Sequence, residues 1–131
     1  MTNIEGLTAR YRALAPSLLK MATDGKRILV VTHIDADGLC SGSAVFAALK
    51  RKGANVALRT VPDLDAKTIG SLKGLGYEFH IFTDLGSTLV TELEGTFGKD
   101  FLVIDHHQIS EADIRSPNVV NAWAYGFDWG K

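Results

Sequence analysis

Short apolar runs alternate along this chain with longer segments of helical periodicity. The first run, residues 27–32, is rich in β-branched residues and is continuous rather than alternating in polarity, which is typical of a strand buried on both faces of a parallel sheet. Further short strands are predicted at residues 55–60, 79–83, 101–104 and 119–120. Strands that alternate with helices form βαβ units. The sequence therefore predicts an α/β fold, in which a parallel sheet of about five strands is flanked by helices on both faces.

The segments between these runs carry the helical patterns. Apolar residues recur at steps of three and four over residues 4–21, which predicts one apolar helix face. Pro16 lies inside this segment and predicts a kink or a restart of the helix. Further helices are predicted over residues 39–52, 63–75 and 87–97.

Length and composition are those of one globular domain. The chain has 131 residues and shows no internal repeat or linker, so residues 1–131 are expected to form a single domain. Within it we expect an N-terminal helical segment over residues 1–24 and an α/β core over residues 26–128. The formal net charge of −1 excludes an obvious basic footprint for nucleic acid.

The cellular setting is predicted from what the sequence lacks. No apolar run approaches the roughly 18 residues of a membrane span, and the first residues do not have the pattern of a signal peptide. The single cysteine, Cys40, cannot form an internal disulfide, which suits a reducing compartment. We therefore expect a cytoplasmic protein with no membrane partner.

Three of the predicted strands run directly into aspartate or histidine. The carboxyl ends of parallel strands open on one edge of the sheet, where ligands bind, so these polar side chains are expected to lie together. The three clusters are His33-Ile34-Asp35-Ala36-Asp37-Gly38, Asp84, and Asp105-His106-His107.

Crowded carboxylates favour a divalent metal site. Four aspartates at one edge would repel one another and raise one another's pKa, and divalent cations remove this cost. Carboxylate oxygen and imidazole nitrogen without thiolate suit Mn²⁺ or Mg²⁺, with Zn²⁺, Fe²⁺ or Co²⁺ also possible. Five or six such ligands suit two ions about 3.5–4 Å apart that share a bridging carboxylate, an arrangement used to hydrolyse phosphate esters.

Each of these residues also has a plainer interpretation. Asp37 or Asp84 could be a helix N-cap, because an aspartate after a strand often is. His80 lies inside a predicted strand and is interpreted as a core residue. Cys40 follows the start of a predicted helix; it could be an activated thiol, but we interpret it as a small packed residue.

Two further features leave alternatives open. The basic residues 50–52 could form a phosphate patch, but they lie in the last turn of a predicted helix, where cations suit the helix dipole. Aromatic residues alternate at positions 123, 125, 127 and 129. They could form a strand face or a stacking surface for bases, and contact with the core or with a partner domain is the favoured interpretation.

The three polar clusters resemble motifs I, II and III of the DHH phosphoesterase superfamily. The resemblance extends over residues 26–128, and the forms HxDADG and DLGS are most similar to RecJ-type nucleases, especially archaeal ones. It implies a parallel sheet flanked by helices. It also implies two divalent cations, Mn²⁺ first and Mg²⁺ second. His33, Asp35 and Asp84 would hold one metal, and Asp37, Asp84 and His106 the other, with Asp84 bridging.

The resemblance also implies roles for the remaining residues of the third cluster. His107 would bind the substrate and stabilise the charge of the scissile phosphate. Asp105 would be a ligand or would orient a histidine. The implied catalytic residues are thus Asp84, Asp105 and His107, and the reaction is attack of a metal-activated water on phosphorus.

Three departures from the family pattern set the expectations for function. A fourth, later motif with a metal-binding aspartate is not found, and Asn121-Ala122 replaces the usual Asn-Pro. The second, substrate-binding domain of the family is also expected to be absent from this chain.

The function implied by the resemblance is that of a divalent-metal-dependent phosphodiesterase or exonuclease, which hydrolyses single-stranded nucleic acid in repair or replication. One alternative is a non-catalytic, helicase-associated scaffold with a partner protein in a replication complex. Another is a superfamily phosphatase that acts on pyrophosphate or short nucleotides. Two bound dications would offset the formal net charge of −1 and place positive charge where a phosphate arrives.

Overall fold

The predicted sheet is present in the computed structural model, which describes residues 2–127. All neighbouring strands are parallel, in the order β2-β1-β3-β4-β5. The α/β prediction is confirmed, including the short fifth strand. The strands are β1 (Arg27–His33), β2 (Asn55–Val61), β3 (Phe79–Thr83), β4 (Phe101–Asp105) and β5 (Val119–Asn121).

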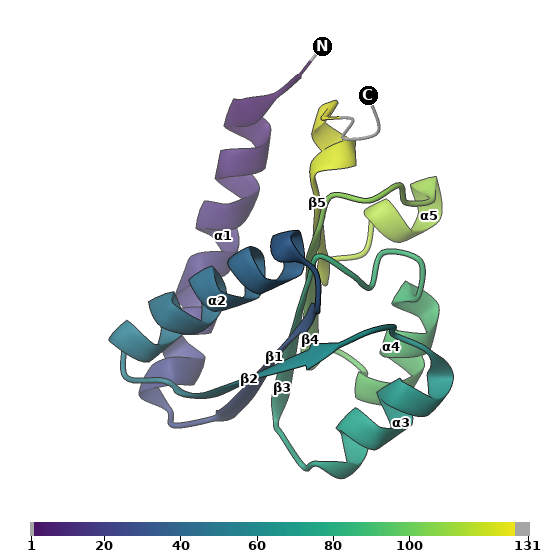
Figure 1. Cartoon of the computed structure of the whole chain (residues 1–131). Helices are drawn as coiled ribbons and strands as arrows, with labels where there is room; N and C mark the ends of the chain where they lie inside the picture. Colours follow the sequence, from purple (N-terminus) through teal and green to yellow (C-terminus); the bar gives the residue numbers. More distant parts are fainter. Residues whose placement is uncertain (1, 128–131) are drawn as a thin grey trace.

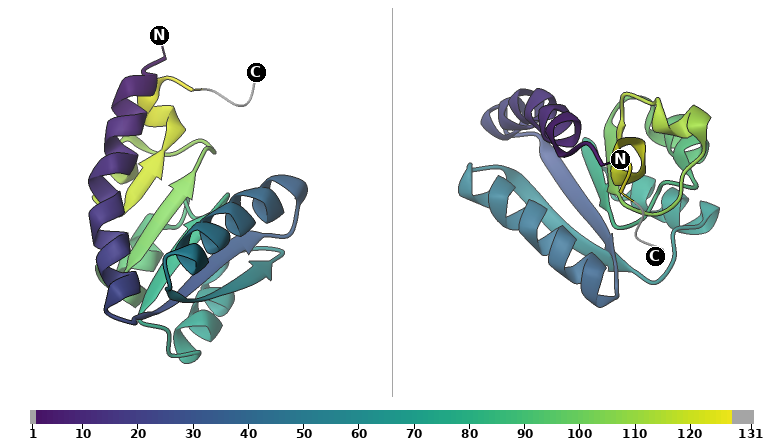
Figure 2. Two further views of the ribbon diagram at one scale, coloured as in Figure 1. Left: turned by 90° about the vertical axis from the view of Figure 1, so that its left-hand side faces the viewer. Right: turned by 90° about the horizontal axis from the view of Figure 1, so that it is seen from above.

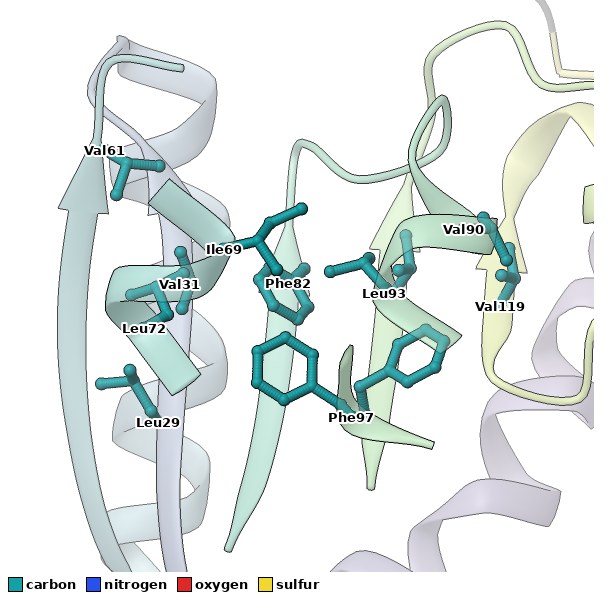
Figure 3. Close-up of a cluster of buried hydrophobic side chains, with 12 residues drawn as sticks. Leu29, Val31, Val61, Ile69, Leu72, Phe82, Val90, Leu93, Phe97 and Val119 are labelled. Carbon is teal, nitrogen blue, oxygen red and sulfur yellow. The ribbon is translucent and has the colours of Figure 1, made fainter. Parts of the chain in front are cut away.

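Helices cover both faces of this sheet (Figures 1 and 2). One face carries α1 and α2, whose buried residues pack on one apolar cluster. The opposite face carries α3 and α4, which pack on a second cluster. Figure 3 shows that second cluster, with Ile69 of α3 and Leu93 of α4 near Phe82 of β3. The helices are α1 (Ile4–Thr23), α2 (Ala36–Arg51), α3 (Ala66–Gly74), α4 (Val90–Phe97), α5 (Glu111–Ile114) and the 3₁₀-helix η1 (Ala122–Tyr125).

Strand β1 lies inside the sheet and explains the continuous apolar pattern of its sequence. Ile28, Val30 and Val31 are each 0% exposed, because helices cover both faces. No helix in the part of the chain that the structure describes is long and apolar enough to span a membrane.

At two places the structure excludes one of the alternatives that the sequence left open. Helix α1 continues through Pro16 without a restart, since this residue is exposed and the carbonyl that its ring deprives of a partner can bond to water. The aromatic alternation does not form a strand, because Ala122–Tyr125 is a 3₁₀-helix that ends at Gly126 in the left-handed conformation. Trp129 lies outside the described residues.

The predicted helix starts were displaced in both directions. Helix α2 begins three residues earlier than predicted, whereas α3 and α4 begin three residues later than predicted. Helices α2 and α3 begin where an aspartate side chain accepts a backbone N–H, at Asp35 from Gly38 and at Asp65 from Thr68. The N-cap of α2 is therefore Asp35 rather than Asp37.

His80 is a core residue, as predicted. It is 2% exposed, and its ring centroid lies 4.1 Å from that of Phe97 and 6.3 Å from that of Phe82. Among the described residues, neither ring nitrogen has a hydrogen-bond partner. Burial, assisted by the nearby Lys73 charge, lowers the pKa of His80 from 6.5 to about 4, although the Leu72 backbone and Asp100 act in the opposite direction.

This buried imidazole predicts a specific loss of stability in acid. The folded-state pKa lies below the unfolded-state value of 6.5, so the unfolded chain binds more protons between pH 6.5 and about 4. The free energy of unfolding therefore falls as the pH falls through this window, by roughly 3 kcal/mol in total. His80→Leu removes the titrating group. The stability gap, defined as the free energy of unfolding of the variant minus that of wild type, should therefore rise as the pH falls below 6.5. Urea unfolding at pH 7.5, 6 and 4.5 measures the gap, and an equal gap at all three values would contradict the prediction.

Candidate metal centre

The pairing register brings the predicted clusters to one level at the carboxyl edge of the sheet. Thr32 of β1 pairs with Thr83 of β3, and Thr83 pairs with Ile104 of β4. The next residue along each strand is His33, Asp84 or Asp105. Two groups of possible ligand atoms result, each within 4.8 Å. The first group is His33, Asp35 and Asp84. The second group is Asp84, Asp105, His106 and His107.

The first group is held by bonds at the β1–α2 turn. His33 Nδ1 lies 2.8 Å from Asp35 Oδ2, and His33 Nε2 lies 2.9 Å from the Pro62 carbonyl oxygen. The hydrogen bond to Asp35 raises the pKa of His33. The hydrogen bond from the Gly38 N–H, followed by the contact with His33, lowers the pKa of Asp35. An imidazole that donates one N–H to a carbonyl can present its other nitrogen to a metal.

Asp84 belongs to both groups and has an unusual conformation. Its φ of 60° is the only positive φ of a non-glycine residue in the described chain, and Asp tolerates this region better than most residues. Asp84 is 5% exposed, and its Oδ1 lies 2.7 Å from His106 Nε2. Its Oδ2 is buried without a hydrogen-bond partner.

The charge of Asp84 is poorly compensated by protein groups alone. Burial raises the pKa of Asp84, and the neighbouring Asp35 carboxylate raises it further, while His106 acts in the opposite direction. A buried carboxylate oxygen without a partner costs free energy. A divalent cation would satisfy that oxygen.

Asp105 organises the second group from a buried position. Its Oδ1 accepts the His106 backbone N–H at 2.8 Å and lies 2.7 Å from His107 Nδ1. Its Oδ2 accepts the Ser87 backbone N–H at 3.3 Å. Burial alone would raise the pKa of Asp105, but the hydrogen bonds from Ser87, His107 and His106 together outweigh it, so this pKa lies below its usual value. Asp105 therefore orients His107.

Two cavities flank Asp84. The larger, about 390 Å³, is lined by both ligand groups except His106, together with the loop after Asp84. The other, about 380 Å³, is lined by Asp37, Cys40 and Ser41 with Asp84 and His106. Asp37 lies outside both ligand groups within the described residues, although it shares this second cavity. Cys40 is exposed there, so its interpretation as a packed residue was wrong, since it lies on the side of α2 that lines the cavity, whereas Gly38 and Gly42 lie on the buried side.

Sequence reasoning missed the hydrogen-bond network behind these residues. Thr32 is fully buried; its Oγ1 donates to the Gly38 carbonyl at 2.7 Å and accepts from Thr83 Oγ1 at 2.8 Å. Asn121 contacts both Ser87 and His107. Asn121 ends an apolar strand just as His33 and Asp105 do, so the same strand-end rule could have found it.

The residues present fit a divalent cation. Their donors are carboxylate oxygens and imidazole nitrogens, which suit Mn²⁺ and Mg²⁺. The unpartnered Oδ2 of Asp84 and the carbonyl contact of His33 are both features of a ligand set prepared for a metal.

A family model described as the DHH family, N-terminal domain, matches residues 27–126. The structure of RecJ in complex with Mn²⁺ from Thermus thermophilus has 25% identity and a TM-score of 0.68 over 86% of this chain and 17% of that one. A structure of exonuclease RecJ bound to manganese has 25% identity and a TM-score of 0.67 over 84% of this chain and 30% of that one.

The fold also occurs in CDC45 from Entamoeba histolytica. That structure has 13% identity and a TM-score of 0.68, over 86% of this chain and 24% of that one. This chain therefore spans less than a third of each of the three structures. A comparison with curated protein sequences gives no significant match.

Proposed function

This chain belongs to the DHH family, and from that premise we propose that it is a divalent-metal-dependent phosphodiesterase that cleaves single-stranded nucleic acid. The observation that carries the proposal is the buried Asp84 carboxylate, shared by two ligand groups and with one oxygen unpartnered. The two RecJ structures bound to manganese support it, each at 25% identity.

We propose two sets of metal ligands; the first is the first ligand group, and the second combines residues that line the other cavity. His33, Asp35 and Asp84 would hold one cation, and Asp37, Asp84 and His106 would hold the second. The cations, when bound, supply Lewis-acid activation of water and neutralise phosphate charge. Mn²⁺ is the proposed ion and Mg²⁺ the second choice.

His107 is proposed to meet the phosphate of the substrate. It lines the larger cavity with Asp84 and Asp105, and its side chain is 56% exposed. Asp105 Oδ1 lies 2.7 Å from Nδ1, which orients the ring, and in the imidazolium form Nε2 donates to a phosphate oxygen. A hydrogen bond to developing negative charge stabilises the transition state more than the ground state.

The test is cleavage of labelled single-stranded DNA and RNA by this chain with Mn²⁺, with duplex DNA and inorganic pyrophosphate as competing substrate classes. Asp35→Asn is expected to reduce cleavage by about 100-fold or more, while the fold is kept because asparagine is also a good N-cap.

Asp65→Asn is the matched control. Asp65 caps α3 as Asp35 caps α2, but it is in neither ligand group. Cleavage of nucleic acid by Asp65→Asn should therefore remain near that of wild type. Equal loss in the two variants, or preference for pyrophosphate over single strands, would contradict the proposed function.

A further inference from the structure

We propose that Asn121 is a positioning residue for His107, and that it acts with Ser87 through a closed ring of hydrogen bonds. The significance of this inference for catalysis rests on the proposed function. Asn121 is the last residue of β5 and pairs with Asp105 of β4. It is 1% exposed, although it lies at the polar edge of the sheet.

The amide of Asn121 reaches two segments of the site. Its Nδ2 donates to Ser87 Oγ at 2.8 Å and to the main-chain oxygen of His107 at 2.9 Å. One hydrogen bond therefore holds the backbone of His107, and the other holds the loop that follows β3.

The ring closes through Asp105. The Ser87 backbone N–H donates to Asp105 Oδ2 at 3.3 Å, and Asp105 Oδ1 lies 2.7 Å from His107 Nδ1. His107 is thus held twice, at its main chain directly by Asn121 and at its imidazole through Ser87 and Asp105. Buried hydrogen bonds of this kind specify one geometry strongly, because water does not compete for the partners.

The residue type at position 121 is specific for this task. Both amide hydrogens are used, and Oδ1 accepts the Trp123 backbone N–H at 2.9 Å. An aspartate has no donor for the His107 carbonyl oxygen and would place a second buried carboxylate near Asp105. Alanine removes all three bonds.

Asn118 provides a matched control on the same polypeptide segment. Its Nδ2 donates to the Phe101 and Lys99 carbonyl oxygens at 2.7 and 3.0 Å. These bonds tie the chain before β5 to the start of β4, away from His107. Asn118→Ala therefore costs two comparable bonds without touching the ring.

The first measurement needs no activity. Nitrogen-15 NMR of the four imidazoles reports tautomer and hydrogen bonding, and His107→Asn assigns the His107 signals. Asn121→Ala is expected to shift the His107 signals and to speed solvent exchange of the proton on Nδ1 by up to about tenfold, the factor that the loss of one hydrogen bond supports, while the His33 signals stay in place. Ser87→Ala should shift the same signals less, and it serves where Asn121→Ala does not fold.

The second measurement separates positioning from a structural role. Asn121→Ala is expected to lower kcat by 10- to 100-fold, the range seen for residues that orient metal ligands. KM and the Mn²⁺ affinity of this variant should stay near wild type. Asn118→Ala should leave kcat, KM and Mn²⁺ affinity unchanged. His107 signals that move equally in the two asparagine variants would overturn the proposal. If the wild-type chain cleaves no phosphodiester, the proposed function fails, and the NMR result still decides whether Asn121 positions His107.

Discussion

Asp84→Asn is expected to abolish metal-dependent cleavage, with a loss in kcat of roughly 1000-fold, and to weaken Mn²⁺ binding by at least about 100-fold. Asp84 is the residue common to both ligand groups, so its loss affects both proposed cations. Asparagine keeps the shape of the side chain and tolerates the φ of 60° at this position. The change therefore removes charge and leaves the turn in place.

The same variant should be more stable than wild type when no metal is present. The Asp84 carboxylate is buried beside Asp35, and its Oδ2 has no partner, so its charge costs folding free energy that an amide does not. Added Mn²⁺ should make wild type the more stable protein. A ligand that binds only the folded state stabilises it by about 2.7 kcal/mol when the ligand concentration is 100 times the Kd.

Thermal unfolding with and without Mn²⁺, together with calorimetric titration, measures this reversal. Asp100→Asn is the control, since Asp100 is an exposed carboxylate next to the start of β4, at the opposite end of that strand. If Asp84→Asn still bound Mn²⁺ with wild-type affinity, the shared-ligand role of Asp84 would be wrong.

The grouping of the candidate ligands could be predicted because it depends on a general property of parallel sheets. Whichever strands are neighbours, their carboxyl ends face one edge, so the residues that follow positions 32, 83 and 104 were expected at the same edge. The charges of Asp35 and Asp84 then pointed to a cation. None of this required knowledge of the pairing register.

The parts that could not be predicted depend on that register and on packing. The contact of Asn121 with Ser87 requires β5 to pair with β4 in one particular alignment. The exposure of Cys40 depends on which side of α2 lines a cavity. A period of two in the aromatic residues near Trp123 is compatible with a strand, but the left-handed Gly126 ends a 3₁₀-helix there instead.

Gly38→Ala is expected to lower the free energy of unfolding by about 3 kcal/mol, at the upper end of the usual cost of overpacking, and to weaken Mn²⁺ binding. A Cβ on Gly38 would lie 2.1 Å from the main-chain oxygen and 2.6 Å from the main-chain carbon of His33. These are backbone atoms of β1, so they cannot rotate aside as a flexible side chain would.

Gly38 itself cannot shift to relieve the clash, because it is bonded on both sides. Its N–H donates to Asp35 Oδ1 at 2.8 Å, and its carbonyl accepts from Thr32 Oγ1 at 2.7 Å. An added methyl group must therefore separate the start of α2 from β1. That movement displaces His33 and Asp35 relative to Asp84 and breaks up the first ligand group.

Gly70→Ala is the matched substitution in the same chain. Gly70 lies inside α3, and a Cβ there meets no atom within 4 Å. Alanine is the better helix former by about 0.5–1 kcal/mol, so this variant should be slightly more stable than wild type and should bind Mn²⁺ as wild type does. Urea unfolding and Mn²⁺ titration of the two variants should thus give changes of opposite sign in stability and a loss of metal affinity in Gly38→Ala alone. A Gly38→Ala protein with wild-type stability would show that the β1–α2 turn is looser than its contacts indicate.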